Sequence, residues 1–579
     1  MEMLRVGPQL RLWFLTQFWK MIPFYGKAAA FLDTCPEKTG SFDNSTQRNP
    51  LPPYGIIGNQ ASYAAGRISN IGGKEEPGKP RGKTSRQMIQ PIENGAHEVI
   101  WEVEYVYHRH HDGDFQLAVG MAVLILTSAV AVYLSVRFKF FQFTRFGHAM
   151  KNTFGKIFDK GDGEGDISPF QACCTALAST LGVGNIAGVS VAIATGGPGA
   201  VFWMWAVALM GFIVKFSEIT LGMAYRERDP ETGRWHGGFY WYVRRGLGKS
   251  WKWLGIFWAV ILGCAMVFAP AVQANSVVEA IRVSFDVPGW IVGVIFAVIM
   301  AVVLVGGIKS ISSFAEKVVP LMALAYVIGS IFILVKFGSN IPHVFAMIFE
   351  YAFTPMAATG GFAGSTVMLA IRWGLARGVY SNEAGTGMAP LAHSSSSANH
   401  PVKQGLWGIS EVFVDTIIVC TMTALVVLCT GVWTEGGTGA ALTATAFGAG
   451  FGNAIAGTVF VVAIITFFAF TTALVNVYYG EICMTVLGGK KFILPYRLLG
   501  CAFAIIGSVG ALSVLWNLFD FFFGVCAVCN LVVCFLMRKQ IGALINDYLT
   551  RLKSGKWEPT SEAAANAIPE LWVNDKAAK

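Results

Sequence analysis

Charged residues are scarce in this sequence. Only 14% of its 579 residues are Asp, Glu, Lys or Arg, whereas 54% are hydrophobic. A soluble globular domain usually has about 25% charged residues, so this chain has too few polar groups to cover a folded surface in water. The composition therefore favours a bilayer as the solvent. The formal net charge is +9, but the basic residues lie between apolar segments and not on one face, which argues against a nucleic-acid partner.

The sequence also lacks the motifs of an intramembrane enzyme. No His-Glu-x-x-His motif or Gly-x-Ser-x-Gly elbow occurs where it could act with a base, so we expect no catalytic residues and no cofactor. Cys526 and Cys529 form a Cys-x-x-Cys pair inside the apolar run FFFGVCAVCNLVVCFL. There they are better interpreted as small apolar residues of a membrane helix than as a redox or zinc site. His393 and the serines at 394–397 are interpreted as a polar linker.

Long apolar segments dominate what is present. A helix needs roughly 20 apolar residues to cross a bilayer, and about eleven segments meet that requirement. We therefore predict an all-α integral membrane protein. The predicted spans are 115–136, 171–196, 199–224, 253–282, 288–306, 317–336, 343–375, 405–430, 454–486, 495–512 and 514–537.

The basic residues predict the orientation of these spans. Lys and Arg collect in every second connection, whereas the intervening connections have almost none, and cytoplasmic loops carry the excess of positive charge. The C-terminus is then cytoplasmic, and the first span enters from outside. The basic connections are 137–160, 226–252, 309–317, 377–403, 490–491 and 538–539.

The ends of the chain differ from its middle. Residues 1–112 are predicted to be a poorly ordered extension, because 31–112 are rich in Asn, Gly, Pro and charge with little periodicity. Within it, the aromatic and basic stretch 10–25 is compatible with a signal-like segment or an interfacial helix. Residues 113–540 are predicted to be the transmembrane domain, and 541–579 a cytoplasmic tail.

Two glycine clusters interrupt the predicted helices. One lies at 180–188 (TLGVGNIAG) and the other at 358–364 (ATGGFAG). Unwound backbone at membrane depth is tolerated only where it lines a cavity or is buried in protein. Glycine pairs alone also fit close helix packing. However, each cluster falls in the first helix of a set of five, which predicts two inverted repeats, 168–337 and 343–538, preceded by one extra helix at 113–137.

Several long motifs resemble the alanine/glycine:cation symporter family. They are GVGNIAGVSVAIATGGPGAVFWMWAVALMG at 182–211, VQANS at 272–276, GGIKSISSFAEKVVP at 306–320 and IRWGLARGVYSNEAGTGMAP at 371–390. The resemblance runs in order from about 115 to 540. It implies a LeuT-type fold with five-plus-five inverted repeats, and sodium- or proton-coupled uptake of small neutral amino acids such as alanine and glycine. It also implies a monomer in the plasma membrane, here a bacterial inner membrane.

The resemblance implies a substrate site in this chain. Gly182, Val183, Gly184 and Asn185 would offer N–H groups and an amide to the substrate carboxylate, which fits the preference of a helix N-terminus for anions. Gln273 would face the substrate, and the segment Gly360, Gly361 and Phe362 would form the opposite wall. Val183 replaces a Thr of the family, and Pro270 introduces a kink close by.

A sodium site is implied beside the first break. Its ligands would be Thr471 and Thr472 together with the carbonyls of about Ala178 and Leu181. Threonine hydroxyls also bond to their own helix, so the pair is weak evidence by itself. One turn after Thr472, the family has Trp where this chain has Asn476. The pocket, of which Thr472 and Asn476 would be part, is therefore expected to be wider and more polar than that of an alanine carrier, which leaves open a different solute or proton coupling. A channel is a further alternative, although no filter-like repeat is visible.

Acidic residues inside apolar segments require partners. Glu411 and Asp415 lie one helical turn apart and so share a face. They fit either a cation relay or a structural ion pair with Arg372 or Arg377, and we favour the ion pair. The motif at 382–385 (NEAG) is interpreted as a loop of the gate region and not as a substrate contact.

Overall fold

The computed structural model describes residues 123–230, 233–282, 285, 287–510 and 513–555, and of 513–517 it describes the backbone alone. These residues belong to one compact unit, Ala96–Lys579. The extension predicted at 1–112 and the last residues of the predicted tail lie outside the described residues. The described chain is almost entirely helical, as predicted; a short antiparallel pair, β1 (Glu227–Arg228) and β2 (Trp235–His236), interrupts it.

The helices of the first half follow a broken path. An apolar helix Val123–Arg137 comes first. It is followed by α4 (Phe141–Thr144), α5 (Phe146–Asn152), α6 (Pro169–Thr180), a π-helical turn Gly184–Gly188, α7 (Val189–Gly196), α8 (Gly199–Ala224), α9 (Phe239–Tyr242), α10 (Lys252–Arg282), α11 (Gly289–Val305) and α12 (Gly307–Lys336).

The second half contains shorter pieces between its long helices. They are α13 (Ile341–Tyr351), α14 (Val367–Asn382), α15 (Ala389–His393), α16 (Pro401–Val412), a π-helical segment Phe413–Cys420, α17 (Thr421–Thr430), α18 (Gly439–Phe451), α19 (Ala454–Gly488), α20 (Ile493–Val509), α21 (Ser513–Leu536) and α22 (Arg538–Ser554).

Seven helices of the described chain are long and apolar enough to cross a membrane, and one bent pair raises the number to eight. That pair is Pro169–Thr180 with Gly184–Gly196, bent by 53°. The break predicted in the second span is therefore present. The span predicted at 199–224 coincides with α8, and 454–486 lies within α19. The total of eleven spans and the inverted repeat stay predictions.

The interruption predicted within the seventh span, 343–375, is present, but it separates two helices. Helix α13 ends at Tyr351 and α14 begins only at Val367. The residues between them form a tight turn, with bridges between Met356 and Ser365 and between Thr359 and Phe362. Gly360 and Gly364 have φ values of 56° and 87°, which suit glycine and not a helix. The glycine cluster thus makes a turn and not a break within a span.

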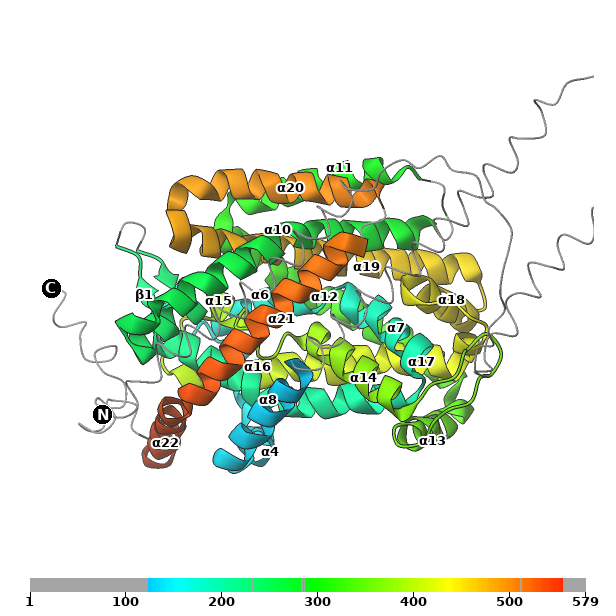
Figure 1. Cartoon of the computed structure of the whole chain (residues 1–579), viewed down its shortest axis with the longest axis horizontal. Coiled ribbons are helices and arrows are strands. Elements are labelled where there is room, and N and C mark those ends of the chain that lie inside the picture. Colours follow the sequence, from blue (N-terminus) through cyan, green and yellow to red (C-terminus); the bar gives the residue numbers. More distant parts are fainter. Residues whose placement is uncertain (1–122, 231–232, 283–284, 286, 511–512, 556–579) are drawn as a thin grey trace, which may run out of the picture. The chain divides into compact units, whose positions relative to one another are not determined.

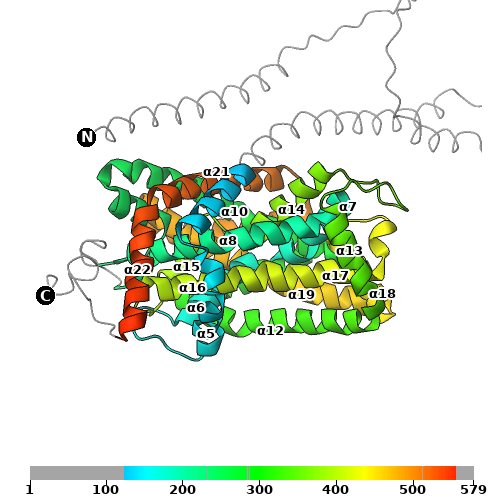
Figure 2. The same ribbon diagram turned by 90° about the horizontal axis from the view of Figure 1, so that it is seen from below.

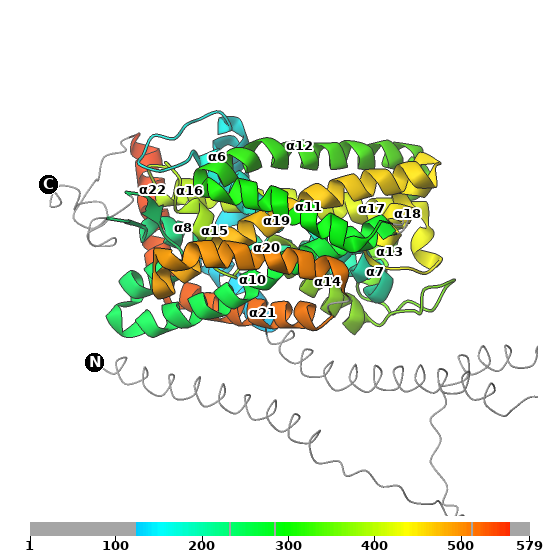
Figure 3. The same ribbon diagram turned by 90° about the horizontal axis from the view of Figure 1, so that it is seen from above.

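The long helices α11, α12, α20 and α21 pack around α10 and α19, whereas α8 packs against α14 and α16 (Figure 1). Helix α10 packs against α19, α20 and α21, and α11 lies beside α20. Helix α21 crosses α10 obliquely in Figure 1. Figure 2 shows α12 along the opposite side, where it packs against α6. All three views place α13 and α18 at one end of the bundle and α22 at the other (Figures 1 to 3).

Helix α22 forms the first part of the predicted tail and is docked on the bundle. Its buried residues recur at helical spacing and make one apolar face; they are Ile541, Leu544, Ile545 and Tyr548. The Asp547 carboxylate lies 3.1 Å from His400 Nε2, immediately before α16, and 2.7 Å from Arg551 Nε. The tail is therefore an ordered part of the fold as far as Gly555.

Candidate functional site

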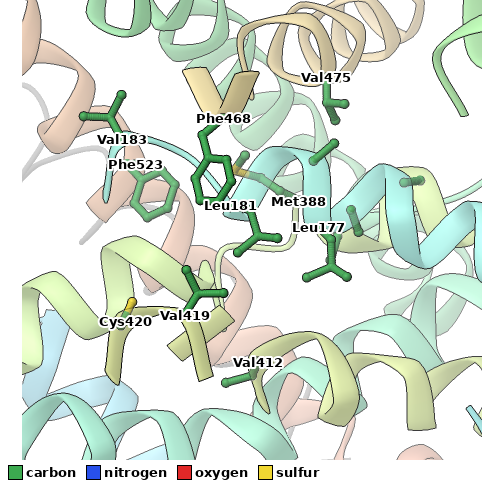
Figure 4. Close-up of a cluster of buried hydrophobic side chains, with 14 of the residues drawn as sticks. Leu177, Leu181, Val183, Met388, Val412, Val419, Cys420, Phe468, Val475 and Phe523 are labelled. Carbon is green, nitrogen blue, oxygen red and sulfur yellow. The ribbon is translucent and has the colours of Figure 1, made fainter. Parts of the chain in front are cut away.

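The first break is set by its sequence. A capping box begins α6: Ser168 caps the N–H of Gln171, whose side chain accepts from the Ser168 N–H in return. The helix stops at Leu181, whose ψ is 84°. A Cβ atom on Gly182 would lie 2.7 Å from Thr472 Oγ1, so this position requires glycine. Apolar side chains from several elements pack around the break, among them Leu177, Leu181, Val419 and Phe468 in Figure 4.

Asn185 stabilises the break from within. Its Oδ1 accepts the Gly182 N–H at 2.9 Å, and its Nδ2 donates to Ser381 Oγ at 2.9 Å and to Asp415 Oδ1 at 2.7 Å. The side chain is fully buried. The amide of Asn185 and the N–H of Gly182 are therefore occupied by the protein, and the structure corrects their predicted role as carboxylate donors. The N–H groups of Val183 and Gly184 begin the next helix, where the first N–H groups have no intrahelical partner.

Thr472 connects α19 to the end of α6. Its hydroxyl lies 3.1 Å from the Ala178 carbonyl oxygen and 3.3 Å from that of Leu181. Thr472, Ala178 and Leu181, three of the four residues predicted to bind sodium, thus lie together. Thr471 is also buried, but its hydroxyl lies 3.1 and 3.0 Å from the carbonyl oxygens of Phe467 and Phe468 in its own helix, which share its one proton. Hard oxygen atoms of this kind are the ligands that alkali-metal cations prefer.

A second break lies at 383–388, between α14 and α15, and every residue in it is buried. Glu383, Gly385 and Gly387 have φ values of 56°, 92° and 80°. Side chains of neighbouring helices bind its backbone. Lys215 Nζ donates to the Asn382 carbonyl at 2.9 Å, Asn530 Nδ2 to that of Gly385 at 2.8 Å and Trp258 Nε1 to that of Thr386 at 3.1 Å. The Gly387 N–H donates to Glu218 Oε2 at 3.1 Å.

The two breaks face a common cavity. From the first break, it is lined by Ser179, Thr180, Gly182, Val183 and Gly184. From other elements, it is lined by Gln273, Tyr380, Glu383, Thr472, Asn476, Phe519 and Phe523. The volume of the cavity is about 20 Å³, which is room for roughly one water molecule. Because an amino acid is larger, its binding requires the lining to move.

Gly360, Gly361 and Phe362 do not line this cavity. The Gly361 N–H donates to the Thr434 carbonyl, and Phe362 packs edge-on against Trp433 with ring centroids 5.2 Å apart. The wall opposite the first break comes instead from Tyr380 and Glu383. Sequence reasoning missed Glu383 because 382–385 was interpreted as a gate loop. The signal was present in Gly385 and Gly387, which lie two and four residues after Glu383 between apolar helices.

A polar cluster joins the two walls. The Ser179 hydroxyl lies 3.0 Å from Glu383 Oε1 and 2.9 Å from the Asn476 side-chain amide. All three residues are at least nine-tenths buried. Asn476 therefore contributes a polar surface to the cavity; that the pocket is wider and more polar than that of an alanine carrier stays a prediction.

A buried charge network lies beside the second break. Lys215 Nζ is 3.0 Å from Glu411 Oε1, and His393 Nε2 is 3.3 Å from Glu411 Oε2; all three side chains are fully buried. The predicted pairing of Glu411 with Arg372 or Arg377 is therefore wrong. Asp415 does not join this network, because it accepts from Asn185, Ser381 and Thr416. Lys215, the lone basic residue within an apolar helix, was the sequence signal for the network.

Two broken helices around a buried polar cavity, inside a bundle of apolar helices, define a multi-pass membrane transporter. The model of the sodium:alanine symporter family matches residues 112–563. The chain therefore belongs to the sodium:alanine symporter family, whose activity is cation-coupled amino-acid transport.

Two relatives and one solved structure are similar to this chain. It is 38% identical over 432 residues to the sodium/alanine symporter AgcS of Methanococcus maripaludis, covering 72% of this chain and 92% of the relative. It is 34% identical over 478 residues to the probable sodium/glutamine symporter GlnT of Bacillus subtilis, covering 81% and 93%. A solved sodium-coupled sialic acid symporter aligns with a TM-score of 0.41 at 13% identity, covering 74% of this chain and 85% of that one.

Proposed function

We propose that this protein is a secondary active symporter that couples sodium entry to the uptake of a small neutral amino acid such as alanine or glycine. The observation that carries the proposal is the approach of the Thr472 hydroxyl to the Ala178 and Leu181 carbonyl oxygens, at 3.1 and 3.3 Å. These oxygens lie at the end of α6, where the helix is broken. A sodium ion held there would stabilise one arrangement of the break and of α19.

The substrate carboxylate is proposed to bind at the start of the helix Gly184–Gly196, to the N–H groups of Val183 and Gly184, because the first N–H groups of a helix have no intrahelical partner and favour anions. Cation and carboxylate would then occupy opposite sides of one break. The cavity has room for about one water molecule, so a substrate can bind only when the lining moves, as alternating access requires.

We further propose a LeuT-type arrangement of two inverted five-helix sets after one extra helix. Its support is the pair of breaks: 181–183 interrupts α6–α7, and 383–388 separates α14 from α15. The second set would thus begin with α14, later than the sequence predicted. The basic connections favour a cytoplasmic location for α22 and the C-terminus, in a protein that acts as a monomer in a bacterial inner membrane.

A longer polar amino acid such as glutamine is a second candidate substrate. Asn476 and Ser179 give the cavity amide and hydroxyl groups that a methyl side chain would not use, and one relative is named a probable glutamine symporter.

Uptake of labelled amino acids into proteoliposomes tests both substrates. The first proposal expects accumulation of alanine or glycine that collapses when choline replaces external sodium. Accumulation of glutamine alone would favour the second candidate. Uptake that ignores sodium but stops with a proton uncoupler would assign the coupling to protons, and passive equilibration without accumulation would contradict symport and favour a channel.

A further inference from the structure

Two hydrogen-bond acceptors in the cavity have no partner within the described part of the chain. They are Glu383 Oε2 and Gln273 Oε1. The two side chains are only 5% and 4% exposed, and both line the cavity. Buried polar atoms are normally paired, and each exception calls for an explanation. A pair of acceptors around one small space indicates a ligand that supplies donors.

The second break presents Glu383 to this space. The carbonyls of Asn382, Gly385 and Thr386 are each bound by a side chain that is not among the residues lining the cavity, namely Lys215, Asn530 and Trp258. Glu383 itself ends α14 in the left-handed region, at φ 56° and ψ 16°, which a non-glycine residue seldom adopts. Such conformations persist where the surrounding structure imposes them, and they cluster at ligand sites.

The charge of the lining narrows the ligand class. Among the described residues that line the cavity, Glu383 is the only Asp, Glu, Lys or Arg. Lys215, the nearest cation of the adjacent network, is engaged with Glu411 at 3.0 Å and with the Asn382 carbonyl. The complementary group is therefore positively charged and rich in donors. A primary ammonium group has three donors and no acceptor.

Ser179 sets the direction of the hydrogen bonds. A hydroxyl has one proton, so Ser179 cannot donate both to Glu383 at 3.0 Å and to Asn476 at 2.9 Å. If the Asn476 amide nitrogen faces Ser179, the chain runs from Asn476 through Ser179 to Glu383 Oε1. That arrangement satisfies one carboxylate oxygen and leaves Oε2 for the ligand.

We propose that Glu383, assisted by Gln273, binds the ammonium group of the transported solute. This inference deepens the proposed function and rests on it, because it concerns the same cavity. The carboxylate of an amino acid at Gly184 and its ammonium at Glu383 would then connect the first break to the second. A sodium ion is the other source of the same positive charge, and the experiment separates the two.

The test measures alanine affinity and sodium half-saturation in proteoliposomes for the wild type and for Glu383→Gln. Loss of a charge-assisted hydrogen bond should weaken alanine binding by about 10- to 100-fold, with the sodium half-saturation unchanged at saturating alanine. The matched control is Glu481→Gln, since Glu481 is also buried but pairs with Arg497 at 2.8 Å away from the cavity. A rise in sodium half-saturation with unchanged alanine affinity would assign the carboxylate to sodium and overturn the proposal, as would two unchanged values.

A second experiment tests binding of the ammonium group at Glu383 independently of whether the protein transports alanine. Ethylammonium and propionate, the two charged halves of alanine, are added at high millimolar concentration to the purified full-length protein, and thermal melting is followed. Ethylammonium should raise the melting temperature of the wild type and not of Glu383→Gln, even if alanine proves not to be transported. Equal stabilisation of both would overturn the inference.

Should Glu383→Gln fail to fold, Glu383→Asp takes its place. This variant keeps the carboxylate but places it on a side chain that is shorter by one methylene, and so farther from the ligand. An intermediate loss of alanine affinity is then expected, and an affinity equal to that of the wild type would contradict the assignment.

Discussion

Asn185 Nδ2 lies 2.7 Å from Asp415 Oδ1, and both side chains are fully buried. This contact connects the first break to the π-helical segment between α16 and α17, 230 residues further along the chain. The same amide accepts the Gly182 N–H. One side chain thus sets the end of α6 and fixes it to a second element.

Asn185→Ala should destabilise the protein and abolish transport. It leaves the Gly182 N–H unpaired and removes a donor from a buried carboxylate, at a cost of roughly 2–4 kcal/mol. Thermal melting in detergent measures the first effect, and alanine uptake the second. Asn546→Ala on the exposed face of α22 is the control. A variant that melts like the wild type would show that the break does not depend on this amide.

Thr472→Ala should weaken the dependence on sodium without unfolding the protein. Removing one neutral oxygen ligand is expected to raise the sodium half-saturation by about tenfold, which corresponds to ~1.4 kcal/mol. Thr466→Ala is the matched control, because Thr466 lies in the same helix and its hydroxyl donates only to the Val462 carbonyl. An unchanged sodium titration in the folded Thr472→Ala variant would remove the proposed ion site.

The losses of stability caused by substituting Lys215 and Glu411 should be strongly non-additive. Lys215→Met leaves a buried carboxylate without its cation and is expected to cost about 3–5 kcal/mol. Adding Glu411→Gln removes the stranded charge, so the double variant should melt at a higher temperature than Lys215→Met alone. Melting curves of the two single variants and the double variant decide this. Additive losses would mean that the two residues stabilise the protein independently.

Docking of α22 should weaken in acid. Burial lowers the pKa of His400 below its ordinary value of 6.5. For Asp547, burial raises the pKa, but hydrogen bonds from His400 and Arg551 outweigh it and bring the pKa below its ordinary value. Because both pKa values are lower in the folded state, the folded state is more stable at neutral pH than in acid. The contribution of His400 is lost as pH falls below about 6.5, and that of Asp547 only at lower pH still.

Hydrogen exchange of the amides of α22 between pH 7.5 and 5 measures this effect. Exchange in α22, corrected for the intrinsic pH dependence, should rise relative to α19. Asp547→Asn removes the carboxylate that partly offsets the effect of burial on the pKa of His400, so its α22 should exchange faster at every pH and with a stronger pH dependence. Protection of α22 that stays constant down to pH 5 would contradict the assignment.

The sequence predicts well what depends on hydrophobic runs and on local backbone preferences. The bounds of α8 and α19 follow from the lengths of their apolar stretches, and the first break follows from glycines at 182, 184 and 188 beside an Asn. The proximity of Thr472 to Ala178 and Leu181 was implied by the family resemblance and is reproduced in the structure.

What depends on packing between distant segments was less predictable. The cluster at 358–364 and the motif at 382–387 both contain glycines next to apolar residues, and sequence alone does not distinguish a turn at a helix end from a break inside the bundle. The deciding contacts come from Lys215, Trp258 and Asn530, which are far away in the chain. The predicted partner of Glu411 was wrong for the same reason. The spacing of residues along one helix does not show which helix lies opposite it.

In the proposed mechanism, one broken helix couples a sodium ion to an amino acid. The most direct test of this coupling is the uptake of labelled alanine into proteoliposomes holding the wild-type protein, with an imposed inward sodium gradient and with equal sodium on both sides. We predict accumulation above the external concentration only with the gradient, and its loss in Thr472→Ala at low sodium. Equal uptake under both conditions would contradict the account.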